Sequence, residues 1–120
     1  DRRRPVGMVN RGGVWWVDFG APFGSEPGFV RPALVVSSDR FNRSRIGTVI
    51  VVAITSNLRL GEAPGNVRLA SGTAGLARES VVNVSQTMVV DRRRLSESSG
   101  ALDRVTMRAV DAGLRLVLSL

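Results

Sequence analysis

Residues 48–54, Thr-Val-Ile-Val-Val-Ala-Ile, form an almost wholly apolar run that is rich in β-branched side chains. A short apolar run bounded by polar residues is typical of a buried strand. The run ends in a polar cluster, Thr55-Ser56-Asn57. The sequence therefore predicts a buried strand whose last residues are polar.

Shorter strand-like segments lie on both sides of this run. Valine and aromatic residues favour a first strand over residues 14–19, and a loop rich in glycine and proline follows at residues 20–30. Further strands are predicted over residues 31–36, 66–69 and 80–90, the last with a bend near Ser85 and Gln86. Residues 39–44 are predicted to form a single helical turn, and the polar residues 91–100 a turn-like segment.

The carboxy-terminal residues change to a helical period. Asp103 is a suitable N-cap, and apolar residues recur on one broad face at Leu102, Val105, Ala109, Val110, Leu114, Val117 and Leu118. Several short strands followed by one helix predict a small single domain that is mainly β with a C-terminal α-helix. The expected architecture is a strongly curved antiparallel sheet or barrel with the helix packed on it.

The composition favours a cytoplasmic protein with a polyanionic partner. The chain has 120 residues, a net charge of +7, and 17 basic residues that are all arginine. Arginine suits bidentate phosphate contacts, although its exclusive use is also typical of a GC-rich genome. No run approaches the roughly 20 apolar residues that span a bilayer, and no signal peptide is evident, so no membrane association is expected. Met8 resembles a natural start, so residues 1–7 are interpreted as a tail or cloning remnant and residues 8–120 as the domain.

The chain contains neither cysteine nor histidine. Disulfides and thiolate metal sites are therefore excluded, and a zinc or copper site is not expected. The sequence predicts no cofactor and no metal.

Polar residues that could bind or cut a phosphodiester lie at the ends of two predicted strands. Ser25 and Glu26 belong to the loop at residues 20–30, Arg31 precedes Pro32 at a strand entrance, and Thr55-Ser56-Asn57 ends the apolar strand. Taken singly, these residues are more typical of a surface ion pair, a turn or a cap. Together they favour a phosphodiester site, because neighbouring strands would bring the loop, Arg31 and Thr55 to one edge of the sheet.

The order of several motifs resembles the MazF/PemK family of toxins. The resemblance is carried by Met8-Val-Asn-Arg-Gly-Gly-Val-Trp-Trp-Val-Asp-Phe19, Gly24-Ser-Glu26, Arg31-Pro-Ala-Leu-Val-Val36, Ala53-Ile-Thr-Ser-Asn57, Pro64-Gly-Asn-Val67, Glu79-Ser-Val-Val-Asn-Val-Ser-Gln86, Val90-Asp-Arg-Arg-Arg-Leu95 and Val110-Asp-Ala-Gly-Leu-Arg-Leu-Val-Leu118. No single motif is diagnostic, but the ordered set is specific and covers nearly all of residues 8–120.

This resemblance implies an SH3-like barrel, a homodimer, and the toxin of a bacterial type II toxin–antitoxin pair. It implies a metal-independent endoribonuclease of single-stranded RNA, inhibited by a MazE-like antitoxin. The family's catalytic arginine falls on Arg31, its catalytic threonine on Thr55, and the loop acidic residue of some members on Glu26; its glutamine falls on Gln86, which is assigned to RNA binding. Val30 stands where some members have a histidine, so no imidazole is expected to act there.

Such a site could work because RNA carries its own nucleophile, the 2′-OH. Arg31 would stabilise the phosphorane charge, Thr55 and Ser56 would hydrogen-bond the phosphate, and Glu26 would act as general base. Ser25 and Asn57 complete the predicted RNA-binding set. The expected products are a 2′,3′-cyclic phosphate and a 5′-OH.

Two other functions fit the sequence. A CcdB-like inhibitor of DNA gyrase shares the fold, but its function depends on an aromatic residue near the carboxy terminus, and this chain has none after Phe41. A non-catalytic SH3-like RNA-binding module is the second alternative. RNA cutting, gyrase–DNA trapping and RNA retention without cutting separate the three.

Overall fold

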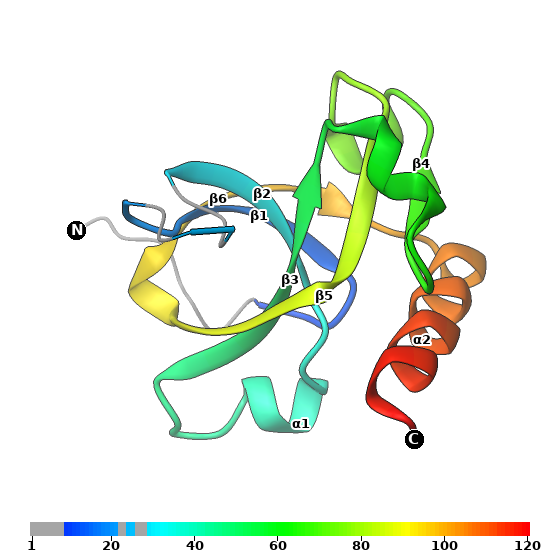
Figure 1. The fold of residues 1–120 in the computed structure, drawn as a ribbon. Helices are drawn as coiled ribbons and strands as arrows, with labels where there is room; N and C mark the ends of the chain where they lie inside the picture. Colours follow the sequence, from blue (N-terminus) through cyan, green and yellow to red (C-terminus); the bar gives the residue numbers. More distant parts are fainter. Residues whose placement is uncertain (1–8, 22–23, 26–28) are drawn as a thin grey trace.

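A computed structural model describes residues 9–21, 24–25 and 29–120. In this part of the chain, six strands form one antiparallel sheet in the spatial order β4-β5-β3-β2-β1-β6, which curls on itself as Figure 1 shows. The strands are β1 (Gly13–Asp18), β2 (Val30–Val35), β3 (Thr48–Thr55), β4 (Val67–Leu69), β5 (Ser80–Asp91) and β6 (Leu95–Ala101). The helices are α1 (Asp39–Asn42) and α2 (Arg104–Leu118), with 3₁₀ turns at Leu58–Glu62, Thr73–Gly75 and Arg92–Arg94.

The apolar run lies at the centre of the sheet, as predicted. β3 pairs with β2 on one side and with β5 on the other. Val52 and Ile54 belong to a core cluster that Val110 of α2 covers, whereas Val49 and Val51 belong to a second cluster with Trp15 and Val35. The strand is thus buried on both faces because the curled sheet and α2 enclose it.

β5 carries the bend that the sequence predicts. Its register against β3 jumps between the pairs Val52–Thr87 and Ala53–Asn83. Residues 84–86 are therefore extra on the β5 side and form a bulge, which turns the strand and changes the direction of its side chains. This bulge lies beside the end of β3, where the polar cluster is.

The interpretation of residues 91–100 as turn-like was wrong. A 3₁₀ turn at Arg92–Arg94 is followed by β6, which is an edge strand paired only with β1 in the described sheet. Leu95 is its buried residue, and the rest is exposed or half-buried. Because so little of this edge strand is buried, its sequence does not alternate between apolar and polar residues, and the strand could not be recognised from that pattern.

The apolar face of α2 is only partly buried. Val110 and Gly113 are buried, but Val105, Val117 and Leu118 are exposed. The broad stripe predicted for the helix therefore does not all face the sheet. Its carboxy-terminal half presents apolar side chains at the surface.

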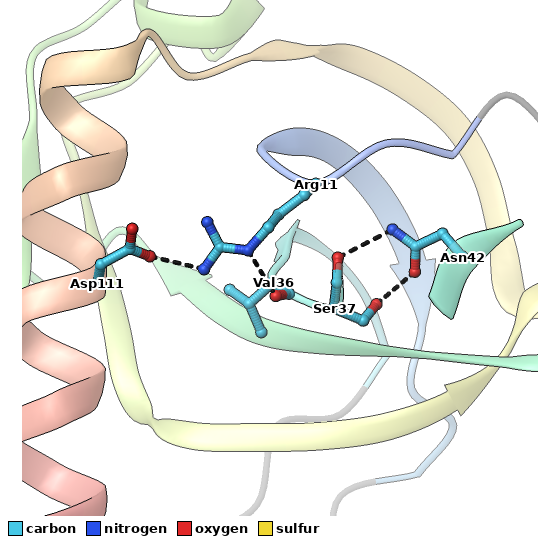
Figure 2. Close-up of polar contacts among 5 residues, drawn as sticks. All are labelled: Arg11, Val36, Ser37, Asn42 and Asp111. Carbon is cyan, nitrogen blue, oxygen red and sulfur yellow. Dashed lines mark hydrogen bonds and ion pairs between the residues drawn. The ribbon is translucent and has the colours of Figure 1, made fainter. Parts of the chain in front are cut away.

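Polar contacts tie the amino-terminal turn to both the sheet and α2 (Figure 2). Arg11 Nε donates to the Val36 carbonyl oxygen at 2.8 Å, and Arg11 Nη2 donates to Asp111 Oδ1 at 2.6 Å. In the same region, Ser37 Oγ donates to Asn42 Oδ1 at 2.5 Å, and Asn42 Nδ2 donates to the Ser37 carbonyl oxygen at 2.9 Å. These bonds hold α1 and α2 at the end of β2 that is opposite to Arg31.

Asp103 caps α2 as predicted, and this contact makes a testable contribution to stability. Its carboxylate accepts a hydrogen bond from the Thr106 N–H at 2.8 Å, which lowers the pKa of Asp103 below its ordinary value of 3.8. A pKa lowered in the folded state gives stability that is present above the ordinary pKa and is lost as pH falls through the lowered one.

Asp103→Ala should therefore lower the melting temperature at pH 7, and the difference in melting temperature from wild type should shrink below about pH 4. Asp103→Asn, which keeps an acceptor without a charge, should melt between the two at pH 7. Equal melting of Asp103→Ala and wild type at pH 7 would contradict the capping role.

Candidate active site

Arg31 and Thr55 lie at adjoining ends of two paired strands. The register of β2 against β3 pairs Ala33 with Ala53. Continued by two residues, this register would set Arg31 beside Thr55, and both residues line the same two cavities. The expectation that neighbouring strands bring these two residues together is confirmed.

Two cavities adjoin at this strand edge, and Arg31, Ile54 and Thr55 line both. One cavity, of about 400 Å³, extends toward the β5 bulge and includes Ser25, Asn83, Ser85 and Gln86 among its polar residues. The other, of about 320 Å³, extends toward Trp16, Ser56 and Arg78. A phosphate at Arg31 and Thr55 would therefore have a cavity on each side.

The Thr55 hydroxyl is held by the turn that follows it. Its Oγ1 accepts a hydrogen bond from the Asn57 N–H at 3.1 Å, so its hydroxyl hydrogen is the part that can donate to a ligand. The Asn57 side chain accepts from the Arg59 N–H at 3.2 Å and caps the 3₁₀ turn at Leu58–Glu62. Asn57 is not among the residues that line either cavity, which places its side chain in the turn instead.

The bulge in β5 brings Gln86 to the loop between β1 and β2. Gln86 Nε2 donates to the Ser25 carbonyl oxygen at 3.3 Å, although the two residues are 61 positions apart. Both residues line the larger cavity beside Arg31 and Thr55. Ser25, Arg31, Thr55 and Gln86 thus come together, whereas Glu26 lies outside the described residues.

Sequence reasoning missed several residues that line the cavities. Trp15 and Trp16 are adjacent in β1 and point to opposite faces. Trp15 is buried in the second core cluster, while half-buried Trp16 packs on the first and lines the smaller cavity. Asn83 and Arg78 were not singled out. A polar residue inside the apolar run Val81-Val82-Asn83-Val84 is the signal that could have revealed Asn83.

Within the described ranges, no three Asp or Glu side chains are grouped so that they could hold a metal ion. None of the helices in these ranges is long and apolar enough to cross a membrane.

Comparison with known structures first defines the class of protein to which this fold belongs. The crystal structure of MazF (Form-I) from Deinococcus radiodurans matches with a TM-score of 0.77 and 26% identity, covering 93% of this chain and 97% of that one. The fold is therefore that of a MazF toxin. Residues 10–118 match the family model described as PemK-like, MazF-like toxin of type II toxin-antitoxin system, and the chain belongs to this family.

Two curated relatives match over almost their whole lengths. Endoribonuclease MazF6 of Mycobacterium tuberculosis (strain ATCC 25618 / H37Rv) is 43% identical over 113 residues, which cover 94% of this chain and 99% of the relative. Endoribonuclease EndoA of Bacillus subtilis (strain 168) is 36% identical over 113 residues, covering 94% and 97%. Both relatives are endoribonucleases by name, which favours RNA cutting over gyrase inhibition.

Proposed function

We propose that this protein cuts single-stranded RNA at short sequences, without a metal ion, by attack of the ribose 2′-OH on the neighbouring phosphate. Endoribonuclease activity follows from its family and from relatives that are 43% and 36% identical. The observation that carries the proposed chemistry is that Arg31 and Thr55, at adjoining strand ends, line the same two cavities. The proposed place of action is the cytoplasm.

Arg31 and Thr55 would stabilise the charge that develops on the phosphate. As the 2′-oxygen bonds to phosphorus and the bond to the 5′-oxygen breaks, negative charge accumulates on the non-bridging oxygens. The Arg31 guanidinium would bind these oxygens through its fixed fork of N–H donors, and the Thr55 hydroxyl would donate beside it. Arginine is a poor proton acceptor, so we assign the removal of the 2′-OH proton to Glu26. The 5′-oxygen takes a proton from water as its bond to phosphorus breaks, and it leaves as a hydroxyl.

The remaining predicted residues would hold the RNA on either side of this phosphate. Ser25 and Gln86 line the larger cavity and Ser56 the smaller one, which supports direct contacts for these three residues. Asn57 would act differently, because its N–H bonds to Thr55 Oγ1 and its side chain caps a turn. Its contribution would be to orient the Thr55 hydroxyl.

The products test the proposed reaction. Incubation with mixed-sequence RNA in EDTA should give fragments with 2′,3′-cyclic phosphate and 5′-OH ends, at the same rate as in buffer with magnesium. End mapping by ligation and mass spectrometry reads both ends. A 5′-phosphate product, or loss of cutting in EDTA, would contradict the mechanism, and RNA retention without cutting would favour the binding module.

Thr55 can be tested by removing only its hydroxyl. Thr55→Val keeps the β-branched shape of a strand residue, so the fold should persist while kcat falls by about 10²-fold, the usual loss for one transition-state hydrogen bond. Thr55→Ser keeps the hydroxyl and should retain most of the rate. Single-turnover cleavage of a defined RNA measures both, and equal rates for Thr55→Val and wild type would remove Thr55 from the mechanism.

The partners follow from the family and from the surface. A toxin of this family has an antitoxin, and we propose that a MazE-like chain covers the RNA site of this protein. We also propose a homodimer that buries the exposed apolar end of α2, where Leu116, Val117, Leu118 and Leu120 are 40% to 84% exposed. Several exposed apolar side chains at one end of a helix favour a protein interface there. Sedimentation equilibrium should give twice the chain mass, and a monomer at micromolar concentration would contradict the dimer.

A further inference from the structure

Asn83 is a polar residue held at the wall of the larger cavity. It lies in β5 opposite Ala53 of β3, and the next pairs along that register lead to Thr55 opposite Val81. Its flanking residues Val82 and Val84 are fully buried, and Asn83 itself is only 9% exposed. Burying an amide costs free energy unless hydrogen bonds compensate it, so the bonds of this side chain need to be accounted for.

A neighbouring asparagine fixes which way the Asn83 amide points. The Val84 N–H donates to Asn66 Oδ1 at 2.9 Å, and Asn66 Nδ2 donates to the Leu60 carbonyl oxygen at 2.8 Å. A backbone N–H can only donate and a carbonyl can only accept, so these two bonds determine the orientation of Asn66. Asn66 Nδ2 also donates to Asn83 at 3.1 Å. The Asn83 atom that faces Asn66 must therefore be its oxygen.

The amide nitrogen of Asn83 consequently faces the cavity. Asn83 Oδ1 also accepts from Ser85 Oγ at 3.2 Å, so the oxygen side of the amide is occupied by two donors. Every buried side-chain nitrogen or oxygen in the described residues has a hydrogen-bond partner. Asn83 Nδ2 takes part in none of the hydrogen bonds that Asn83 makes with the described residues. It is therefore not a fully buried atom, and it reaches accessible surface. The surface that Asn83 lines is this cavity.

The cavity has the size and lining of a nucleobase site. Its volume is about 400 Å³, and apolar atoms can face a flat base from Ala53, Ile54, Leu60 and Ala63. Single-stranded RNA is read by placing an unstacked base against apolar surface and hydrogen-bonding its edge. Because Arg31 and Thr55 line the same cavity, the base held there belongs to a nucleotide that adjoins the scissile phosphate.

We propose that Asn83 is a specificity-determining residue that selects a base with a keto oxygen at this position, uracil or guanine over cytosine or adenine. The proposal rests on the proposed RNA-cutting function. Nδ2 can only donate, so it pairs with a keto oxygen and opposes an exocyclic amino group. Asn66 acts through Asn83 as a positioning residue, because it prevents the amide from turning round.

The test replaces the Asn83 amide, which donates a hydrogen bond through Nδ2, with a carboxylate of nearly the same shape, which only accepts. Wild type, Asn83→Asp and Asn83→Ala are each given a set of RNAs that differ at one position adjoining the cut. The RNAs compare uracil with cytosine, and guanine with adenine, at each such position in turn. At one position, wild type should favour the keto base by about fivefold to tenfold in kcat/KM, the range of one hydrogen bond. Asn83→Asp keeps the acceptor toward Asn66 and Ser85 and should reverse this preference, whereas Asn83→Ala should abolish it.

Ala63→Asp is the matched control for charge, because it adds a carboxylate to the same cavity at a residue that makes no hydrogen bond to Asn83. It should slow all four RNAs by a similar factor and leave the keto preference in place. Thermal melts of the variants establish that each is folded. If wild type cuts RNA and the base preferences of Asn83→Asp and Asn83→Ala equal those of wild type, the inference about Asn83 is overturned while the proposed function stands. If wild type cuts no RNA, the proposed function itself fails.

Discussion

Arg31→Ala is expected to reduce RNA cleavage by roughly 10³-fold to 10⁵-fold, the range for an arginine that stabilises a phosphoryl transition state. The reason is that Arg31 and Thr55 line both cavities, and we propose that the scissile phosphate binds where these cavities adjoin. The side chain is exposed at the start of β2, so its removal should leave the melting temperature within experimental error. Single-turnover cleavage of a defined RNA, with thermal melting on the same samples, measures both effects.

Two further variants separate charge from geometry. Arg31→Lys keeps the positive charge but loses the planar fork that binds two phosphate oxygens, so its rate should lie between those of wild type and Arg31→Ala. Arg40→Ala removes an exposed arginine from α1, which lies outside both cavities, and should cut at the wild-type rate. Wild-type cleavage by Arg31→Ala would place the active site elsewhere on the molecule.

Gly113→Ala is expected to destabilise the fold by roughly 2 kcal/mol or more, although alanine is the better helix former. Gly113 in α2 packs directly on the backbone of Gly65, and an added Cβ would overlap the Gly65 carbonyl group. Alanine gains about 1 kcal/mol over glycine within a helix. This gain cannot offset the overlap, because the atoms that must move are backbone on both sides and not a flexible side chain. Chemical and thermal unfolding measure the net change.

Gly47→Ala is the matched control, since a Cβ at Gly47 would meet nothing within 4 Å. Its stability should equal or slightly exceed that of wild type. A Gly113→Ala variant that unfolds at or above the wild-type denaturant concentration would show that α2 can move away from the sheet at little cost. In that case the Gly65–Gly113 contact would not determine where the helix packs.

Much of the fold was predictable because its signals are local. The run Val49–Ile54 is short, apolar and rich in β-branched residues, which favours a buried strand, and the Asp103 cap precedes a run with helical period. β6 was not predicted because it is an edge strand, paired only with β1 among the residues that the structure describes, and such a strand needs few apolar residues. The exposure of the apolar end of α2 was not predicted either, because periodicity shows which residues share a face but not whether another element covers that face.

By itself, the sequence established the family resemblance, the central strand, the terminal helix, and Arg31 and Thr55 as the residues to test. It could do so because these depend on residue type, order and spacing. The three-dimensional arrangement was needed for the rest: the β5 bulge that carries Gln86 to Ser25, the turn that holds the Thr55 hydroxyl, and the orientation of the Asn83 amide. The first and the last depend on hydrogen bonds between segments distant in the chain, whose partners are specified only when the sheet has curled and its registers are set. The bond between Asn57 and Thr55 joins near neighbours, and it depends on the backbone conformation that the chain adopts as it leaves β3.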